Sequence, residues 1–435
     1  MKYTINGLCD FLRGAVSSFH AVREMTDILD AAGFVRLQEG QRWQIAPGGR
    51  YYTTRNQSSL IAFTVPQCGF APVCAVASHS DSPVFRLKQN AELEIQGKYL
   101  LLNVERYGGM IMSTWMDRPL SVAGRVLVRG ARGLETKLVD IDRDALLIPS
   151  LAIHMNREVN ESNRLNAQTD MLPLLGDAGV KGSLMRQIAE NAGVSPEQIA
   201  GSDLYLYNRM PPRVWGESGE YISAARLDDL ECAYTALCAF TEAKSGAHIN
   251  CFCCFDNEEV GSGTRQGADS TLLSDVLRRA AAALGAGEEE FQAALASSFM
   301  VSADNAHAMH PHHPEKYDQT NRVFMNEGVV IKFSANQKYT TDGVSCALFA
   351  DVCRRAGVPV QHFANRSDMV GGSTLGNISG AHVSIPTVDI GLAQLAMHSS
   401  YETAGVRDAQ YMASALTACY ETELSVRSDG VYEIG

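Results

Sequence analysis

The sequence predicts an α/β protein with a mostly parallel central sheet and a second, β-rich domain inserted into it. Apolar runs of strand length alternate with helical stretches, which is typical of a parallel sheet covered on both faces. Between residues 86 and 223 the pattern changes to short alternating segments separated by glycine-rich turns. The chain has 435 residues, more than the roughly 250–300 at which a single core stops growing. We therefore expect a discontinuous domain, 1–85 and 224–435, interrupted by an insertion, 86–223.

An amphipathic helix is expected near the start of the chain. Apolar residues recur at helical spacing over residues 8–32, and Gly33 follows as a stop signal. Charged residues interrupt residues 1–22, so no apolar stretch there is long enough for a membrane span or a secretion signal. We expect a cytoplasmic protein.

The later elements follow from apolar runs and helical spacing. Buried strands of the central sheet are predicted at residues 72–78, 249–255, 298–302, 329–333 and 387–390. Helices are predicted at 230–243, 275–284 and 344–356. Within the insertion we expect strands at 92–95, 100–104 and 124–128 and a helix at 181–191.

Charge and cysteine content exclude several classes of function. The net charge of −12, without a basic run, argues against nucleic acid and anionic membrane as partners. The eleven cysteines form neither a paired framework nor a CxxC metal site, and three of them lie within the apolar run 251–254. We expect reduced thiols that pack as small apolar groups.

Chemically reactive side chains cluster near the ends of the predicted strands. In an open α/β sheet the carboxyl ends of parallel strands meet along one edge, so residues distant in sequence can lie together there. Imidazole and carboxylate groups in that crevice would form a mixed nitrogen and oxygen site for one or two divalent ions. The candidates are His79, Asp81, Asp228, Glu258, Glu259, Asp304 and His398.

Glu258 and Glu259 give the strongest of these signals because they closely follow the apolar run 249–255. Neighbouring side chains on extended backbone point to opposite sides, so one carboxylate can hold a metal while the other handles a proton. Two like charges at the end of an apolar strand repel each other unless a cation compensates. The pair therefore predicts metal-assisted hydrolysis.

The other candidates have simpler explanations when each is considered alone. His79 and Asp81 would share one side of a strand, where the carboxylate could orient the imidazole for a metal, but a structural histidine would show the same spacing. Asp228 and Asp229 precede an apolar helix and could be an N-cap pair. Asp304 could be a turn residue, with competition for a ligand role from His307 and His310.

Seven segments of the chain together resemble the aspartyl aminopeptidase family of metalloaminopeptidases, family M18. They occur in the family's order and span nearly the whole chain, so no single motif carries the resemblance. The segments are HSDSP (79–83), ARLDDLECAY (225–234), DNEEVGSGT (256–264), SADNAHAMHP (302–311), KFSANQKY (332–339), GGSTLG (371–376) and MHSSYE (397–402).

The resemblance implies roles for individual residues. Asp228 would bridge two divalent ions, which we expect to be zinc, with manganese or cobalt as alternatives. Glu258 would be the general base, Asp81 would orient His79, and Lys332 would lie at the substrate pocket. The implied metal ligands are His79, Asp228, Glu259, Asp304 and His398.

The resemblance also implies an assembly. The inserted domain would drive homo-oligomerisation, commonly into a tetrahedral dodecamer, and His154 would reach the active site of a neighbouring subunit. Peptides would be the substrates, with a preference for acidic N-terminal residues if Lys332 pairs with their side chains. Two departures bear on that preference: the segment 397–402 lacks the more basic residue expected before its acidic residue, Glu402, and extra histidines follow Pro311.

Two alternatives to an aminopeptidase remain open from the sequence. A metallo-carboxypeptidase or amide deacylase of the same architecture would use the same ligands but would recognise a substrate carboxylate instead of a free amine. A non-catalytic assembly or cargo protein could keep the family shell without turnover. The intact Glu258 next to Glu259 argues against the second alternative.

Overall fold

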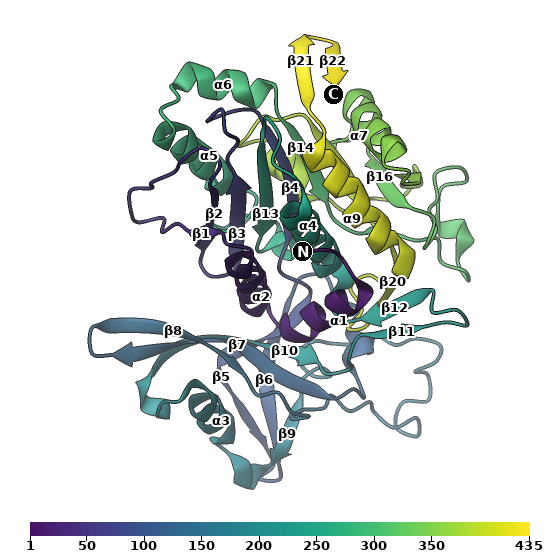
Figure 1. Cartoon of the computed structure of the whole chain (residues 1–435). Helices are drawn as coiled ribbons and strands as arrows, with labels where there is room; N and C mark the ends of the chain where they lie inside the picture. Colours follow the sequence, from purple (N-terminus) through teal and green to yellow (C-terminus); the bar gives the residue numbers. More distant parts are fainter.

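The computed structural model describes all 435 residues and has a larger and a smaller lobe (Figure 1). The larger lobe is built on a nine-stranded sheet. Its order is β1 (Val35–Arg36), β2 (Arg50–Arg55), β3 (Ser59–Thr64), β13 (Ile249–Phe255), β4 (Val73–His79), β14 (Phe299–Ala303), β18 (Thr387–Gly391), β16 (Val329–Phe333) and β17 (Val360–Ala364).

The four strands β13, β4, β14 and β18 are parallel neighbours at the centre of this sheet. All residues of β4 and β13 are buried, which explains their continuous apolar sequences. The predicted α/β class with a mostly parallel central sheet is confirmed, and the five predicted core strands lie within two residues of those observed.

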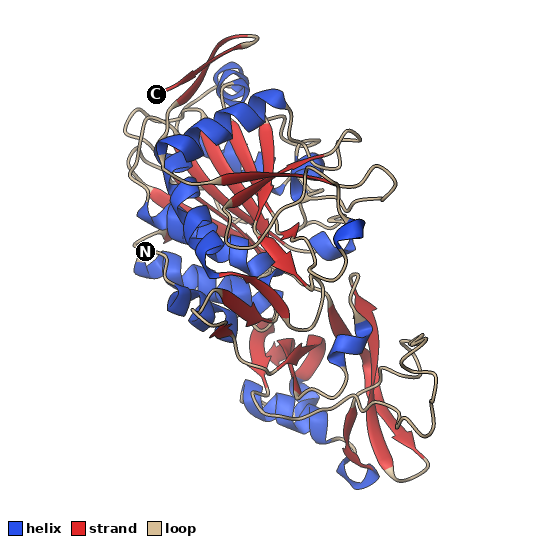
Figure 2. Ribbon diagram, turned by 90° about the vertical axis from the view of Figure 1, so that its right-hand side faces the viewer, coloured by secondary structure: helices blue, strands red, loops and turns tan.

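Helices cover both faces of the central sheet, as both views show (Figures 1 and 2). The side chains of the central strands β4, β13 and β14 alternate between two cores, one on each face. One core includes α1 (Ile5–Gly14), α2 (Ser18–Ala31), α4 (Leu227–Glu242), α7 (Gly343–Arg355) and α9 (Val406–Glu421). The other includes α5 (Leu272–Ala283), α6 (Glu288–Ala296) and α8 (Leu375–Ser379).

The smaller lobe is a six-stranded antiparallel sheet with its own apolar core. Helix α3 (Ser183–Ala192) contributes Leu184 and Ile188 to that core. The strand order is β8 (Gly133–Asp140), β7 (Leu120–Gly130), β10 (Ile199–Asn208), β5 (Val84–Ile95), β6 (Tyr99–Tyr107) and β9 (Leu174–Asp177).

A third sheet includes the end of the predicted insertion. Neither of the last two strands of the range 86–223 joins the six-stranded sheet: they pair with each other, and the second of them pairs with the C-terminal part of the chain. The order is β11 (Arg213–Trp215), β12 (Tyr221–Ala224), β20 (Glu402–Gly405), β19 (Ala393–Leu395) and β15 (Ala306–His307). The chain ends in a hairpin of β21 (Leu424–Ser428) and β22 (Val431–Ile434).

The prediction of one helix over residues 8–32 is wrong, because the segment forms two helices, α1 and α2. Ser17 begins α2 as its N-cap, with its hydroxyl accepting from the His20 amide. The Arg226 guanidinium donates to the Leu12 carbonyl near the end of α1 at 2.9 Å. Apolar spacing continues across the break because both helices face the same core. No helix of the structure has the length and apolar character of a membrane span.

Candidate metal centre

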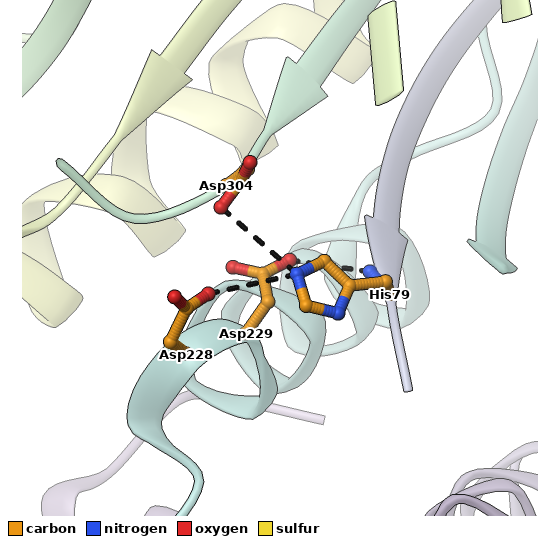
Figure 3. Close-up of side chains that lie close together, drawn as sticks. All are labelled: His79, Asp228, Asp229 and Asp304. Atoms are coloured by element: carbon orange, nitrogen blue, oxygen red, sulfur yellow. Dashed lines mark hydrogen bonds and ion pairs between the residues drawn. The ribbon is translucent and has the colours of Figure 1, made fainter. Parts of the chain in front are cut away.

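The predicted ligand residues come together where the central parallel strands end. His79 is the last residue of β4, and Asp304 follows β14 directly. Asp228 lies in the first turn of α4, and its carboxylate faces the His79 ring (Figure 3). His398 lies between β19 and β20, with a left-handed backbone at φ 66°. The adjacent parallel strands β4 and β14 therefore bring His79 and Asp304 to one edge of the sheet, where a helix and a loop add Asp228 and His398.

Asp228 lies between the two histidines. One of its carboxylate oxygens, Oδ1, is 3.5 Å from His79 Nε2, and the other, Oδ2, is 3.4 Å from His398 Nε2. Asp304 Oδ1 is 4.0 Å from the same His79 nitrogen, and Glu259 Oε2 is 3.3 Å from the His398 nitrogen. All five residues belong to groups whose ligand atoms lie within 4.8 Å of one another, and Asp228 is shared by two of these groups.

Glu258 and Glu259 do not continue the strand, so the expected extended backbone is wrong. Asn257 turns the chain with φ 65°, and the two glutamates begin a short 3-10 helix, Glu258–Val260. The turn still brings both carboxylates to the His79 imidazole. Glu258 is partly exposed at the open side of the cluster, where the side chain of His398 is 30% exposed.

Asp81 stabilises this turn. Its carboxylate accepts hydrogen bonds from the backbone amides of Glu258 and Glu259, both at 3.1 Å. Its main-chain carbonyl lies 3.0 Å from His79 Nδ1, and its carboxylate oxygen Oδ1 lies 3.4 Å from the same atom. The carbonyl, more than the predicted carboxylate, therefore orients the ring, which leaves Nε2 directed at the cluster.

Two acidic residues of the centre were not predicted. Asp229, expected only as a capping residue, accepts the His79 amide at 3.2 Å and lies in the same group of potential ligands. Glu402 accepts the backbone amides of His398 at 2.7 Å and Asp228 at 3.1 Å. Adjacent aspartates at a helix start are a weak signal for the first, and the signal for the second is its place in the segment 397–402, which resembles the family.

Negative charge exceeds positive charge in the cluster. Burial, followed by neighbouring carboxylates, raises the pKa of Glu259 well above its usual range and that of Glu258 to about 8. Burial lowers the pKa of His398, but Asp228 and other acceptors outweigh it and raise the pKa to about 9. Burial alone would raise the pKa of Asp228, but the two histidines outweigh it and lower that pKa below its usual range.

The side chains present fit a divalent cation. Three buried carboxylate oxygens, on Asp228, Asp229 and Glu259, have no hydrogen-bond partner. An unpaired buried carboxylate is costly, and a bound cation would compensate it. The donor set of imidazole nitrogens and carboxylate oxygens suits zinc, manganese or cobalt. His307, His310, His312 and His313 belong to none of the potential ligand groups.

Lys332 lies deep in the protein rather than at an open pocket wall. Its side chain is 2% exposed, and Nζ donates to the Asp304 carbonyl at 2.7 Å. Nζ is also 3.8 Å from the Asp304 carboxylate and 5.2 Å from the centre of the Tyr339 ring. This geometry favours a role in positioning Asp304 over contact with a substrate carboxylate.

His154 lies on an exposed segment of the inserted domain and belongs to no potential ligand group of its own chain. Its neighbours include large apolar side chains that are strongly exposed: Leu151 (62%), Ile153 (46%) and Met155 (74%).

Comparison with known proteins identifies the family. The family model described as aminopeptidase I zinc metalloprotease (M18) matches residues 11–420. A probable M18 family aminopeptidase 2 of Clostridium acetobutylicum is 46% identical over 422 residues, which cover 95% of this chain and 97% of the relative.

Solved structures agree with that assignment. A structure of the Ape4 and Nbr1 complex superimposes with a TM-score of 0.92 at 35% identity, covering 96% of this chain and 85% of that chain. A structure of an S. cerevisiae mApe1 dodecamer gives a TM-score of 0.83 at 27% identity, covering 96% of each chain. With the family model matched over nearly its whole length, the chain belongs to the M18 family of zinc metalloproteases and is a metalloaminopeptidase.

Proposed function

We propose that this aminopeptidase holds two divalent metal ions, with Asp228 as the bridging ligand. The observation that carries the proposal is the position of Asp228, whose two oxygens each face a different histidine. His79 and Asp304 would complete one metal position, and Glu259 and His398 would complete the other. Zinc agrees with the description of the family, and manganese or cobalt would accept the same donors.

Glu258 is the proposed general base. Zinc bound in the cluster would polarise the scissile carbonyl and lower the pKa of water. Glu258 would take a proton from the attacking water as the carbon–oxygen bond forms, and deliver it to the leaving amine as the carbon–nitrogen bond breaks. Its partly exposed side chain lies beside His79 and Glu259, within reach of a substrate entering the open side.

A comparison of peptides tests the proposed substrate class against the two alternatives. Peptides with a free N-terminus should be cleaved, and N-acetylated versions of the same peptides should not. Chelation of the metal should abolish cleavage, and restoring zinc, manganese or cobalt should return it. Cleavage of acetylated peptides from the C-terminus would indicate a carboxypeptidase, and metal binding without cleavage of any peptide would indicate an assembly protein.

We propose, from the family resemblance, a preference for N-terminal aspartate or glutamate. Because Lys332 bonds to Asp304, another basic group would have to meet the acidic side chain. A peptide panel that varies only the first residue would measure the preference. Equal kcat/KM values for acidic, neutral and basic residues would contradict it.

We also propose a homo-oligomer, probed first as a dodecamer because a structural relative carries that description. The exposed apolar side chains around His154 suit burial against a second copy of the chain. In such an assembly His154 would act at the metal centre of a neighbouring subunit.

A further inference from the structure

Tyr107 joins the inserted domain to the metal centre. It is the last residue of β6, and its hydroxyl donates to Asp81 Oδ2 at 2.6 Å. The same hydroxyl accepts from Asn257 Nδ2 at 2.8 Å. Asp81 in turn accepts the amides of Glu258 and Glu259. The Tyr107 hydroxyl therefore stabilises both Asp81, which orients His79, and the turn at Asn257 that precedes the two glutamates.

The chain immediately after Tyr107 holds a second ligand. The Gly109 carbonyl accepts a hydrogen bond from Nδ1 of His398, which leaves Nε2 of that ring facing Asp228 and Glu259. The Ile111 amide donates to the His398 carbonyl at 3.0 Å. Both the ring and the backbone of His398 are therefore fixed by the insertion segment.

Gly108 permits this close approach. Its backbone has φ 75°, in the region that favours glycine. A Cβ atom there would lie 3.1 Å from the Glu259 Cβ and 3.3 Å from the Glu259 carbonyl oxygen. Gly109 is different, because its φ is not positive and an added Cβ would only reach ordinary contact with His398, at 3.7 Å.

We infer that residues 107–111 of the inserted domain position the metal ligands of their own chain, with Tyr107 as the main positioning residue. Metal-bound histidines and carboxylates depend on such outer hydrogen bonds, whose loss commonly weakens metal affinity or activity about 10- to 100-fold. The inserted domain would thus be needed within each subunit, in addition to any part it has in assembly. This inference rests on the proposed ligand set.

The first test is Tyr107→Phe, which removes the hydroxyl and keeps the ring. Zinc affinity of the full-length protein, measured by competition with a fluorescent chelator, should fall about 10- to 100-fold. The kcat should fall while KM changes little, because Tyr107 acts through Asp81. Tyr205→Phe is the matched control: its ring centroid is 6.2 Å from that of Tyr107, and its hydroxyl forms no hydrogen bond within the protein. It should bind zinc as the wild type does.

A pair of glycine variants gives an independent test. Gly108→Ala should weaken zinc binding, because the strained backbone moves away from Glu259 and His398. Gly97→Ala is the control: its φ is also positive, at 66°, but it lies in the turn between β5 and β6, where an added Cβ would approach only the Glu94 carboxylate, at 3.9 Å, so zinc should bind normally. If Tyr107→Phe does not fold, this pair decides, and equal affinities in the two variants would overturn the inference.

The outcomes separate this inference from the proposed function. Wild-type affinity and wild-type kcat in Tyr107→Phe would overturn the positioning role while leaving the metal centre intact. A wild-type protein that binds no zinc at this cluster would instead refute the proposed ligand set on which the inference depends.

Discussion

At the scale of single residues, the centre is organised by carboxylates that meet several partners at once. Asp228 faces two histidines, Asp81 accepts two consecutive amides, and Glu402 accepts the amides of two candidate ligands far apart in sequence. The several partners of each group cannot be recognised from its own sequence neighbourhood, because these contacts are made only in the folded chain. His79 and the glutamate pair stand out in the sequence because His79 ends a buried strand and the glutamates follow another within a few residues.

Glu258→Gln is the most direct test of the general base. The amide is close to the carboxylate in size but cannot accept the proton, so turnover should fall at least about 100-fold. Metal content should remain, because Glu258 is not among the proposed ligands. Glu289→Gln, on the exposed surface of α6, is the control and should retain full activity. Near-normal turnover of Glu258→Gln, measured as kcat, would remove Glu258 from its role.

At the scale of elements, the strands were predictable and the N-terminal helices were only partly so. Five buried strands were located because continuous apolar sequence reflects burial on both faces. The break between α1 and α2 was missed, because Ser17 and His20 form a cap whose signal is hidden within an uninterrupted apolar spacing. The turn at Asn257 was missed because a left-handed residue leaves no apolar pattern.

The start of α2 should make stability depend on pH. His20 is 3% exposed, and burial, followed by Arg23 and Arg226, lowers its pKa to about 4. In the unfolded chain the histidine pKa is near 6.5, so the unfolded state binds the proton more readily than the folded state. The contribution of His20 to the free energy of unfolding is therefore fully present above about pH 6.5 and is lost as the pH falls toward 4. Lowering the pH from 7.5 to 5 should therefore reduce the free energy of unfolding by about 2 kcal/mol through His20.

Urea unfolding of wild type and His20→Gln at the two pH values would measure that contribution. The variant should lose about 2 kcal/mol less stability than wild type over this range. His312→Gln removes an exposed histidine and should follow the wild-type profile. Parallel profiles for wild type and His20→Gln would contradict the assigned titration.

At the scale of the whole molecule, the two lobes meet at the metal centre. The change of sequence pattern over residues 86–223 corresponds only in part to the six-stranded sheet. The contacts of this segment with Asp81 and His398 could not be predicted, because they join segments more than 20 residues apart through single hydrogen bonds. The return of β11 and β12 to the third sheet was also hidden, since strands of only three and four residues have no distinctive spacing.

Subunit mixing tests whether His154 acts across an interface. His154→Ala and Glu258→Gln assemblies should each be weakly active. If subunits share sites, dissociating the two assemblies and reassembling them together should restore part of the activity, because some sites then combine an intact His154 with an intact Glu258. Full activity of an isolated wild-type monomer, established by size-exclusion chromatography with light scattering, would contradict a shared site.

Anomalous diffraction from crystals grown with zinc tests the two-metal centre most directly. We expect two zinc peaks in each subunit, one beside His79 and Asp304 and the other beside Glu259 and His398, with Asp228 coordinating both. A single peak at the cluster would contradict the bridging role of Asp228. Peaks elsewhere, with these five side chains left uncoordinated, would contradict the metal centre itself.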